Sequence, residues 1–120
     1  METFKPAPIK PTISIDTFEQ LDIRVGTILR VDDVRGSKRL VRLTVDFGDA
    51  QRRIIAGMKQ ERDDPTEVEG HQALFVVNLD PRTILGELSE GMLLDIGYAD
   101  GVRPVLTVPE MPVPNGVRAG

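Results

Sequence analysis

Hydrophobic and polar residues alternate along residues 23–32, the first clearly patterned segment of the chain. The odd-numbered positions hold Ile23, Val25, Thr27, Leu29 and Val31. This period of two predicts a long β-strand with one face on a core. Just before it, Asp16 followed three residues later by Glu19 predicts one short helical turn with Asp16 as its N-cap.

Later segments have the length and apolar content of strands, separated by glycine-containing turns, and they cover residues 40–47, 51–56, 73–78, 92–96 and 102–108. Between the second and third of these, residues 63–70 predict one short helix, with Asp64 as N-cap and Pro65 at its first position. No second helix of 10–15 residues is predicted that could cross over between parallel strands. The pattern therefore favours an all-β oligonucleotide-binding (OB) fold, a five-stranded Greek-key barrel with one or two short helices and extended terminal segments.

Length and composition indicate one compact domain of 120 residues. We expect residues 1–11, which are interrupted by prolines, to form a flexible N-terminal segment and residues 12–120 to form the domain. The proline-rich stretch 108–116 is expected to run extended along a surface or a partner. No apolar run approaches the roughly 18 residues of a membrane span.

The chain contains no cysteine and a single histidine, His71. These two facts exclude disulfides, thiolate metal sites and a pair of histidines around a metal or in a catalytic relay. We therefore expect a cytoplasmic protein without metal, cofactor or catalytic residues. Two pairs of adjacent acids, Asp32-Asp33 and Asp63-Asp64, lie in predicted turns and are better explained as caps.

Charge is distributed unevenly along the chain. The net charge is −4, yet residues 35–62 carry eight cations against three acids and hence +5. A polyanion responds to the local field within roughly 8–10 Å, so RNA remains a candidate ligand. The cations that flank the predicted second and third strands, where OB barrels bind nucleic acid, are Lys38, Arg39, Arg42, Arg52, Arg53 and Lys59. On composition alone, RNA binding and a charged surface that is merely solvated are equally good interpretations of these cations. The predicted barrel favours RNA binding.

Aromatic residues are scarce: the chain has four phenylalanines, one tyrosine, Tyr98, and no tryptophan. Most of them are expected to be buried. Because stacking on aromatic side chains contributes about 1–3 kcal/mol per base, their scarcity favours phosphate and shape contacts with structured RNA.

The segment 78–94 is a long predicted loop between strands, and loops of this length usually have a function. Gly91 and Met92 lie near its end. Gly91 could let a backbone or a ligand approach closely, and Met92 could offer an apolar contact beside the Ser89 hydroxyl. Local reasoning favours the simpler alternative, in which Gly91 permits a bulge and Met92 fills the core.

Three motifs in this order resemble the tRNA-binding domain at the C-terminus of many methionyl-tRNA synthetases. They are Asp22-Ile23-Arg24-Val25-Gly26-Thr27-Ile28, Leu43-Thr44-Val45-Asp46-Phe47-Gly48, and Asn78-Leu79-Asp80-Pro81-Arg82 followed by Ser89-Glu90-Gly91-Met92-Leu93-Leu94. The resemblance covers residues 12–117. Similar domains occur in the endothelial monocyte-activating polypeptide and in CsaA-type secretion chaperones, which the ending Pro112-Val113-Pro114-Asn115-Gly116 resembles.

The resemblance implies an OB-fold homodimer that binds the outside of tRNA without reading its sequence and without catalysis. The RNA-facing positions that it implies are Lys38, Arg42, Arg53, Asn78, Arg82, Ser89 and Met92. Thr83 and Leu85 stand where family members often carry cations, so we expect weaker, still salt-sensitive binding. An aminoacyl-tRNA synthetase is a candidate partner. The alternative function is a CsaA-type chaperone that binds unfolded peptides.

Overall fold

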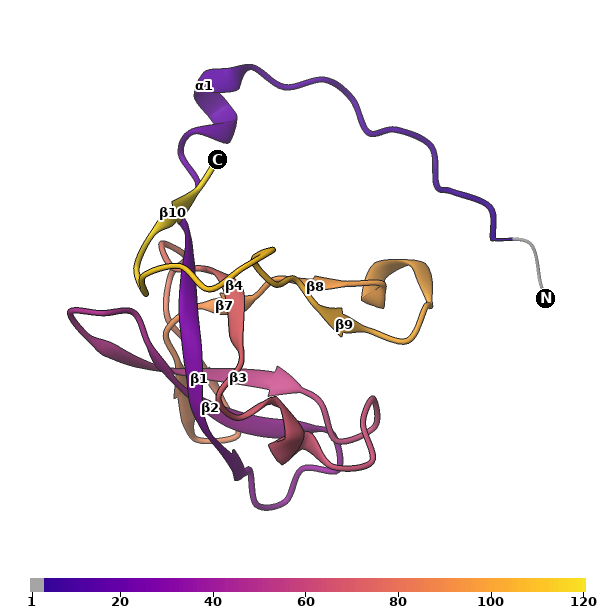
Figure 1. Cartoon of the computed structure of the whole chain (residues 1–120). Coiled ribbons are helices and arrows are strands. Elements are labelled where there is room, and N and C mark those ends of the chain that lie inside the picture. Colours follow the sequence, from indigo (N-terminus) through magenta and orange to yellow (C-terminus); the bar gives the residue numbers. More distant parts are fainter. Residues whose placement is uncertain (1–3) are drawn as a thin grey trace.

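The computed structural model describes residues 4–120 and is dominated by antiparallel sheet (Figure 1). The main sheet has the strand order β3-β2-β1-β4-β7, with β10 beside β1. Its strands are β1 (Ile23–Asp33), β2 (Leu40–Asp46), β3 (Gln51–Gly57), β4 (Gln72–Val76), β7 (Met92–Leu93) and β10 (Arg118–Ala119). Two small hairpins are formed by β5 (Arg82–Ile84) with β6 (Glu87–Ser89) and by β8 (Asp95–Ile96) with β9 (Val105–Leu106). The helices are α1 (Ile15–Phe18) and the 3-10 turns η1 (Pro65–Val68) and η2 (Tyr98–Asp100).

Strand β1 is as long as predicted, but its alternation changes phase in the middle. The register with β2 shifts between Ile28 and Arg30, which places one extra residue, Leu29, in a bulge. Ile28 is consequently fully buried and Leu29 is 43% exposed. The prediction that Leu29 shares the buried face of Val25 and Val31 is therefore wrong.

The expected all-β, OB-like class is confirmed, whereas a barrel closed by a continuous ladder is not present. In residues 4–120 no ladder joins β3 to β7. Individual hydrogen bonds bridge this gap instead: Glu90 N donates to Arg53 O (2.8 Å), and Ile55 N donates to Ser89 Oγ (3.1 Å). The Arg52 guanidinium adds bonds to the carbonyls of Val77 (2.6 Å) and Glu90 (3.1 Å). One main-chain bond and the side chains of Ser89 and Arg52 thus connect β3 to the segment 77–90 where no ladder is formed.

The core lies between β1, β2, β3 and β4. Phe47 and Phe75 meet edge to face in it, with their ring centroids 5.5 Å apart. Gly26 is required for this packing, because a Cβ at this position would lie 2.5 Å from Val45 Cγ1 and 2.8 Å from Phe47 Cε1. A second, smaller cluster of Val34, Leu40 and Ile55 packs against Ile84 of the β5–β6 hairpin, so this hairpin covers part of the outer face of β2 and β3.

The two predicted helical turns are both present, with one change of cap. Asp64 caps η1 and Pro65 occupies its first turn, as expected. Helix α1 is capped by Ser14, whose Oγ accepts a hydrogen bond from Thr17 N (3.1 Å), and Asp16 lies inside the first turn. The prediction of Asp16 as N-cap is wrong because Ser14 is the residue with extended backbone geometry.

The two terminal segments differ in how they lie. Residues 4–14, which include residues 4–11 of the expected flexible segment, leave α1 and run away from the sheet (Figure 1). Residues 1–3 of that segment lie outside the described residues. The proline-rich tail is extended, as expected, and lies along its own chain. Gly116 N donates to Val25 O (2.8 Å), and the Asn115 side chain bonds to Thr27 (2.8 Å) and Gln72 (3.0 Å). In the described range 4–120, every helix is too short or too polar to cross a membrane.

Candidate nucleic-acid interface

The predicted cations do not all converge on one wall of the sheet. Arg53 lies opposite Thr44, and Arg42 lies opposite Ile55, so Arg42 and Arg53 share the outer face of β2 and β3. Arg52 is the next residue along β3 and points to the other side, where its guanidinium binds the carbonyls of Val77 and Glu90. The strand period therefore separates two adjacent arginines, and Arg52 has a structural role in closing the barrel.

Two further predicted cations are held by intramolecular partners. Arg42 donates to Glu87 (3.0 Å) and lies 3.5 Å from Asp32. Lys59 donates to the carbonyl oxygens of Val34 (3.3 Å) and Ser37 (2.6 Å) and pairs with Asp33. Lys59 thus stabilises the loop between β1 and β2, and part of the local positive charge is neutralised.

Four predicted cations remain available. Their residues are exposed, and in the described part of the chain their side chains have no hydrogen-bond or ion-pair partner: these are Lys38, Arg39, Arg53 and Arg82. Lys38 and Arg39 precede β2, Arg53 lies on the outer face of β3, and Arg82 begins β5. These side chains can contact phosphate without first breaking an existing bond.

Asn78 and Ser89, which the resemblance places at the RNA, are engaged within the chain. The Asn78 side chain accepts from Asp22 N (2.8 Å) and donates to Gln20 O (2.6 Å). Ser89 is only 6% exposed, and its hydroxyl accepts from Ile55 N and donates to Gly91 O (3.1 Å). Both side chains hold segments of the fold together in this structure.

The structure does not support the simpler alternative for Gly91 and Met92. A Cβ on Gly91 would lie 3.0 Å from Val76 O, so this glycine permits a close approach of backbone, and the pairing of β4 with β7 beside it shows no register shift. Met92 is 45% exposed. The expectation that Met92 fills the core is therefore wrong, and its thioether is available to a ligand.

The aromatic residues are less buried than expected. Only Phe47 and Phe75 are in the core, while Phe4, Phe18 and Tyr98 are exposed, with Tyr98 at 60%. Tyr98 begins η2, between two glycines in left-handed backbone conformations, Gly97 and Gly101. The sequence offered Tyr98 among five aromatic candidates for stacking on bases, but it did not predict which of them are exposed.

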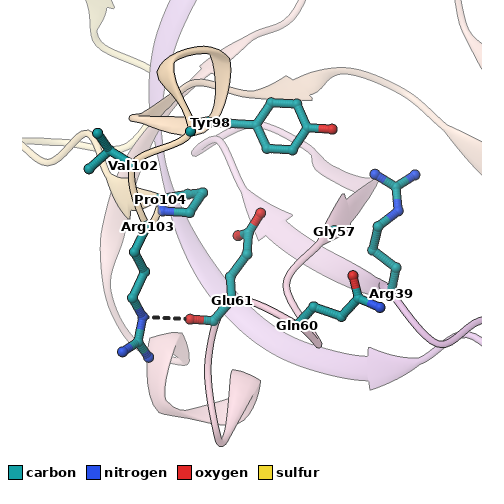
Figure 2. Close-up of a pocket in the computed structure, with 9 residues that line it drawn as sticks. Arg39, Gly57, Gln60, Glu61, Tyr98, Val102, Arg103 and Pro104 are labelled. Carbon is teal, nitrogen blue, oxygen red and sulfur yellow. Dashed lines mark hydrogen bonds between the residues drawn. The ribbon is translucent and has the colours of Figure 1, made fainter. Parts of the chain in front are cut away.

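Tyr98 overhangs a cleft of about 340 Å³ between the end of β3 and the β8–β9 hairpin. Figure 2 shows the Glu61 carboxylate pointing into the space below the Tyr98 ring, with Arg39 on one side and Arg103 and Pro104 on the other. A smaller cavity continues from this cleft and is lined by Ile55, Met92 and Asp95 together with the shared residues Arg39, Glu61 and Tyr98. Arg103 anchors the arrangement by donating from Nε to Glu61 O (2.8 Å). Neither Glu61 nor Arg103 was among the predicted site residues.

The electrostatics of the cleft are mixed. Burial raises the pKa of Glu61 above its ordinary value of 4.5, and the charge of Asp95 raises it further, while Arg62 and Arg39 act in the opposite direction. Elsewhere, the hydrogen bond from Arg24 Nε (2.8 Å) lowers the pKa of Asp22. Residues 4–120 contain no group of three or more side chains arranged to hold a metal.

An OB-like sheet that carries exposed cations beside an open cleft is typical of a binding domain of the oligonucleotide-binding class. The family model described as "Putative tRNA binding domain" matches residues 23–118. The chain belongs to this family.

Relatives of the chain include two methionine–tRNA ligases. The ligase of Archaeoglobus fulgidus is 40% identical over 109 residues, which are 91% of this chain and 16% of the ligase. The ligase of Nitrosomonas europaea is 38% identical over 112 residues, which are 93% of this chain and again 16% of the ligase. The chain therefore matches only a small part of the length of these ligases.

Two solved structures have the same fold. A MetRS-related protein from Pyrococcus horikoshii superposes with a TM-score of 0.84 at 30% identity, covering 92% of this chain and 100% of that one. The chaperone CsaA from Bacillus anthracis superposes with a TM-score of 0.79 at 29% identity, with the same coverage. The resemblance drawn from the three sequence motifs is thus confirmed.

Proposed function

We propose that this domain binds tRNA through its structure, without catalysis and without reading a sequence. The observation that carries this proposal is a set of exposed cations on a domain of the tRNA-binding family whose side chains have no partner within residues 4–120, namely Lys38, Arg39, Arg53 and Arg82. Met92 adds an exposed apolar contact. Arg42 belongs to the same face as Arg53 but is shared with Glu87 and Asp32, so its contribution is smaller.

The proposal is tested by filter binding of bulk tRNA over a range of salt concentrations. Each phosphate contact contributes about 0.9 to the slope of log affinity against log salt on a duplex. With Thr83 and Leu85 in place of cations, we expect few such contacts, hence weak binding that still falls as salt rises. An affinity that stays flat between low and moderate salt contradicts the proposal.

Charge reversal at Arg53 makes the test specific to the surface. Arg53→Glu breaks no side-chain bond of the described residues, whereas the Arg42→Glu variant also breaks the pairs with Glu87 and Asp32. A matched control is Arg118→Glu, which changes the net charge equally at an exposed residue of β10 whose side chain has no bond in the described residues. We expect Arg53→Glu to weaken tRNA binding and to flatten its salt slope, and Arg118→Glu to do neither.

We also propose that the domain is a homodimer. Helix α1 and the segment before it expose Ile9 (98%), Ile13 and Ile15, and this segment leaves the sheet without packing on it (Figure 1). A second copy would remove these apolar side chains from water. Size-exclusion chromatography with light scattering at low micromolar concentration tests this; particles of only 13 kDa would contradict it.

We propose an aminoacyl-tRNA synthetase as the partner of this domain in the cell. As part of a synthetase or bound to one, the domain would raise the local concentration of tRNA near a catalytic site by adding a second contact. This role follows from the similarity to a small part of two methionine–tRNA ligases.

A chaperone function is the second candidate, and one observation favours it. A groove of about 520 Å³ runs beside the proline-rich tail and is lined by Thr27, His71, Val108, Met111 and Pro112, among others. An extended peptide could occupy it. Unfolded peptide should then bind to the Arg53→Glu variant as well as to the unmodified protein, because the groove does not include that residue.

A further inference from the structure

The cleft below Tyr98 has features that phosphate binding does not explain. Its volume of about 340 Å³ is that of a small-ligand site, for which about 300–1,000 Å³ is typical. An exposed tyrosine forms one side, and the Glu61 carboxylate points into the space (Figure 2). The cavity beside α1 also places an exposed ring, Phe18, near a partly buried acid, Asp22, but that acid is paired with Arg24.

Glu61 lacks a compensating partner for its charge. Its carboxylate has no hydrogen bond or ion pair in residues 4–120, although burial and the neighbouring Asp95 both disfavour its ionised form. A partly buried carboxylate without a partner costs stability. A ligand that donates hydrogen bonds to it would remove that cost.

The negative charge at the centre of the cleft also determines which part of a nucleotide can enter it. Glu61 and Asp95 repel a phosphate, so the phosphates must stay at the rim, where Arg39 and Arg103 lie. The base then faces the interior, where Tyr98 offers a ring for stacking. Met92 lines the adjoining cavity and connects the cleft with the proposed RNA-binding surface.

Among the four RNA bases, only guanine presents two adjacent N–H donors, N1–H and the N2 amino group, on its Watson–Crick edge. An ionised carboxylate has only acceptors and can take both. We propose that this cleft binds one unstacked guanine of the RNA, with Tyr98 stacking on the base and Glu61 accepting from N1–H and N2–H. This inference rests on the proposed tRNA binding and adds to it one position at which a base is read, whereas the remaining contacts follow the shape and the phosphates of the tRNA.

The chain provides its own probe for the test, because Tyr98 is its only tyrosine and it has no tryptophan. Tyrosine fluorescence therefore reports on this cleft alone. We would titrate the full chain with uridine pentanucleotides that carry a central guanine or a central adenine, using free N-acetyltyrosinamide to correct for absorption by the bases. A fluorescein label on each pentanucleotide gives the affinity independently by anisotropy.

We expect the guanine pentanucleotide to quench Tyr98 and to bind about tenfold more tightly than the adenine one, as two hydrogen bonds to a charged group would allow. Tyr98→Ala should weaken its binding at least about fivefold, the lower limit for loss of one base stack, and Tyr98→Phe should keep the affinity. Glu61→Gln should abolish the guanine preference without lowering the melting temperature, because it removes a charge that burial disfavours. If Glu61 had only a structural role, the Glu61→Gln variant would have a lower melting temperature than the unmodified protein.

The outcomes separate this inference from the proposed function. If tRNA binds by filter assay, but saturating tRNA leaves Tyr98 fluorescence unchanged and Tyr98→Ala binds it normally, the guanine site is rejected and tRNA binding stands. Equal affinities for the guanine and adenine pentanucleotides also reject it. If guanine-selective quenching occurs while tRNA fails to bind at low salt, the site is supported and the proposed function is rejected.

Discussion

Ser89 is a position that the family resemblance assigns to RNA, but its hydroxyl is bonded within the chain. Replacing it tests whether this residue stabilises the fold or binds the ligand. In Ser89→Ala, the buried backbone N–H of Ile55 loses its acceptor, and Gly91 O loses a donor. Leaving one buried donor unpaired costs about 1–3 kcal/mol. The loss falls where β3 and the segment 89–91 have no ladder between them, so neighbouring main-chain bonds cannot take over.

The cost is large relative to the stability of such a domain, which is typically about 5–15 kcal/mol. Urea denaturation should show it directly: with a slope of about 1–3 kcal/mol per molar, the midpoint should fall by on the order of 1 M. Thr83→Ala is the matched control, since it also removes a hydroxyl from this hairpin but from an exposed residue. Its midpoint should hardly change.

Measured well below the midpoint, tRNA affinity should be the same in Ser89→Ala and the unmodified protein. The opposite pattern, unchanged stability with a loss of tRNA affinity, would refute the reasoning. It would place Ser89 at the RNA, as the family resemblance alone implies.

Three further predictions concern the stability of the fold. Leu85 has a φ of 49° in the turn between β5 and β6, so Leu85→Asn should stabilise the protein by about 1 kcal/mol in urea denaturation, and no change would contradict strain at this turn. Gly26→Ala should destabilise it by about 1–3 kcal/mol in the same assay, because the added Cβ would overlap Val45; a neutral effect would show that the core gives way freely. The pKa of Asp22 is lowered in the folded state by Arg24, so its stabilising contribution should be present above pH 3.8 and disappear as the pH falls through the lowered value. The difference between the unmodified protein and Asp22→Asn in acid denaturation should shrink accordingly, and a difference that grows toward low pH would contradict this.

The periodicity of the chain predicted the strands well because burial of apolar side chains decides where strands form. It could not predict the bulge at Leu29, since an extra residue in one strand depends on how its partner is registered. It also could not predict that residues 78–94 contain the β5–β6 hairpin, whose three-residue strands are too short to show a period.

The candidate site was predicted in part for a related reason. A count of cations along the chain cannot tell Arg52 from Arg53, which the strand period sends to opposite sides. Nor can it show that Lys59 is used by the loop between β1 and β2. Tyr98 and Glu61 are far apart in sequence and meet only through the packing of the β8–β9 hairpin beside β3. Local sequence determines the conformation of each strand or helix, whereas the neighbours of a side chain from another part of the chain depend on the tertiary fold.

The ion pairs of this acidic chain contribute little to the stability of the fold. Their main effect is on where the surface of the domain has a positive potential. The side chains of Arg42 and Glu87 are only 24% and 27% exposed, but water still reaches and screens the pair, so the bond between them (3.0 Å) contributes no more than about 1 kcal/mol to folding. It does neutralise a cation on the proposed RNA-binding face. Glu87→Gln should therefore leave the urea midpoint nearly unchanged, raise tRNA affinity and steepen its salt slope, because Arg42 gains freedom to reach phosphate. Glu110→Gln changes the net charge equally, at an exposed residue of the proline-rich tail, and should have little effect; equal gains in the two variants would show that net charge, and not the position of the cations, governs binding.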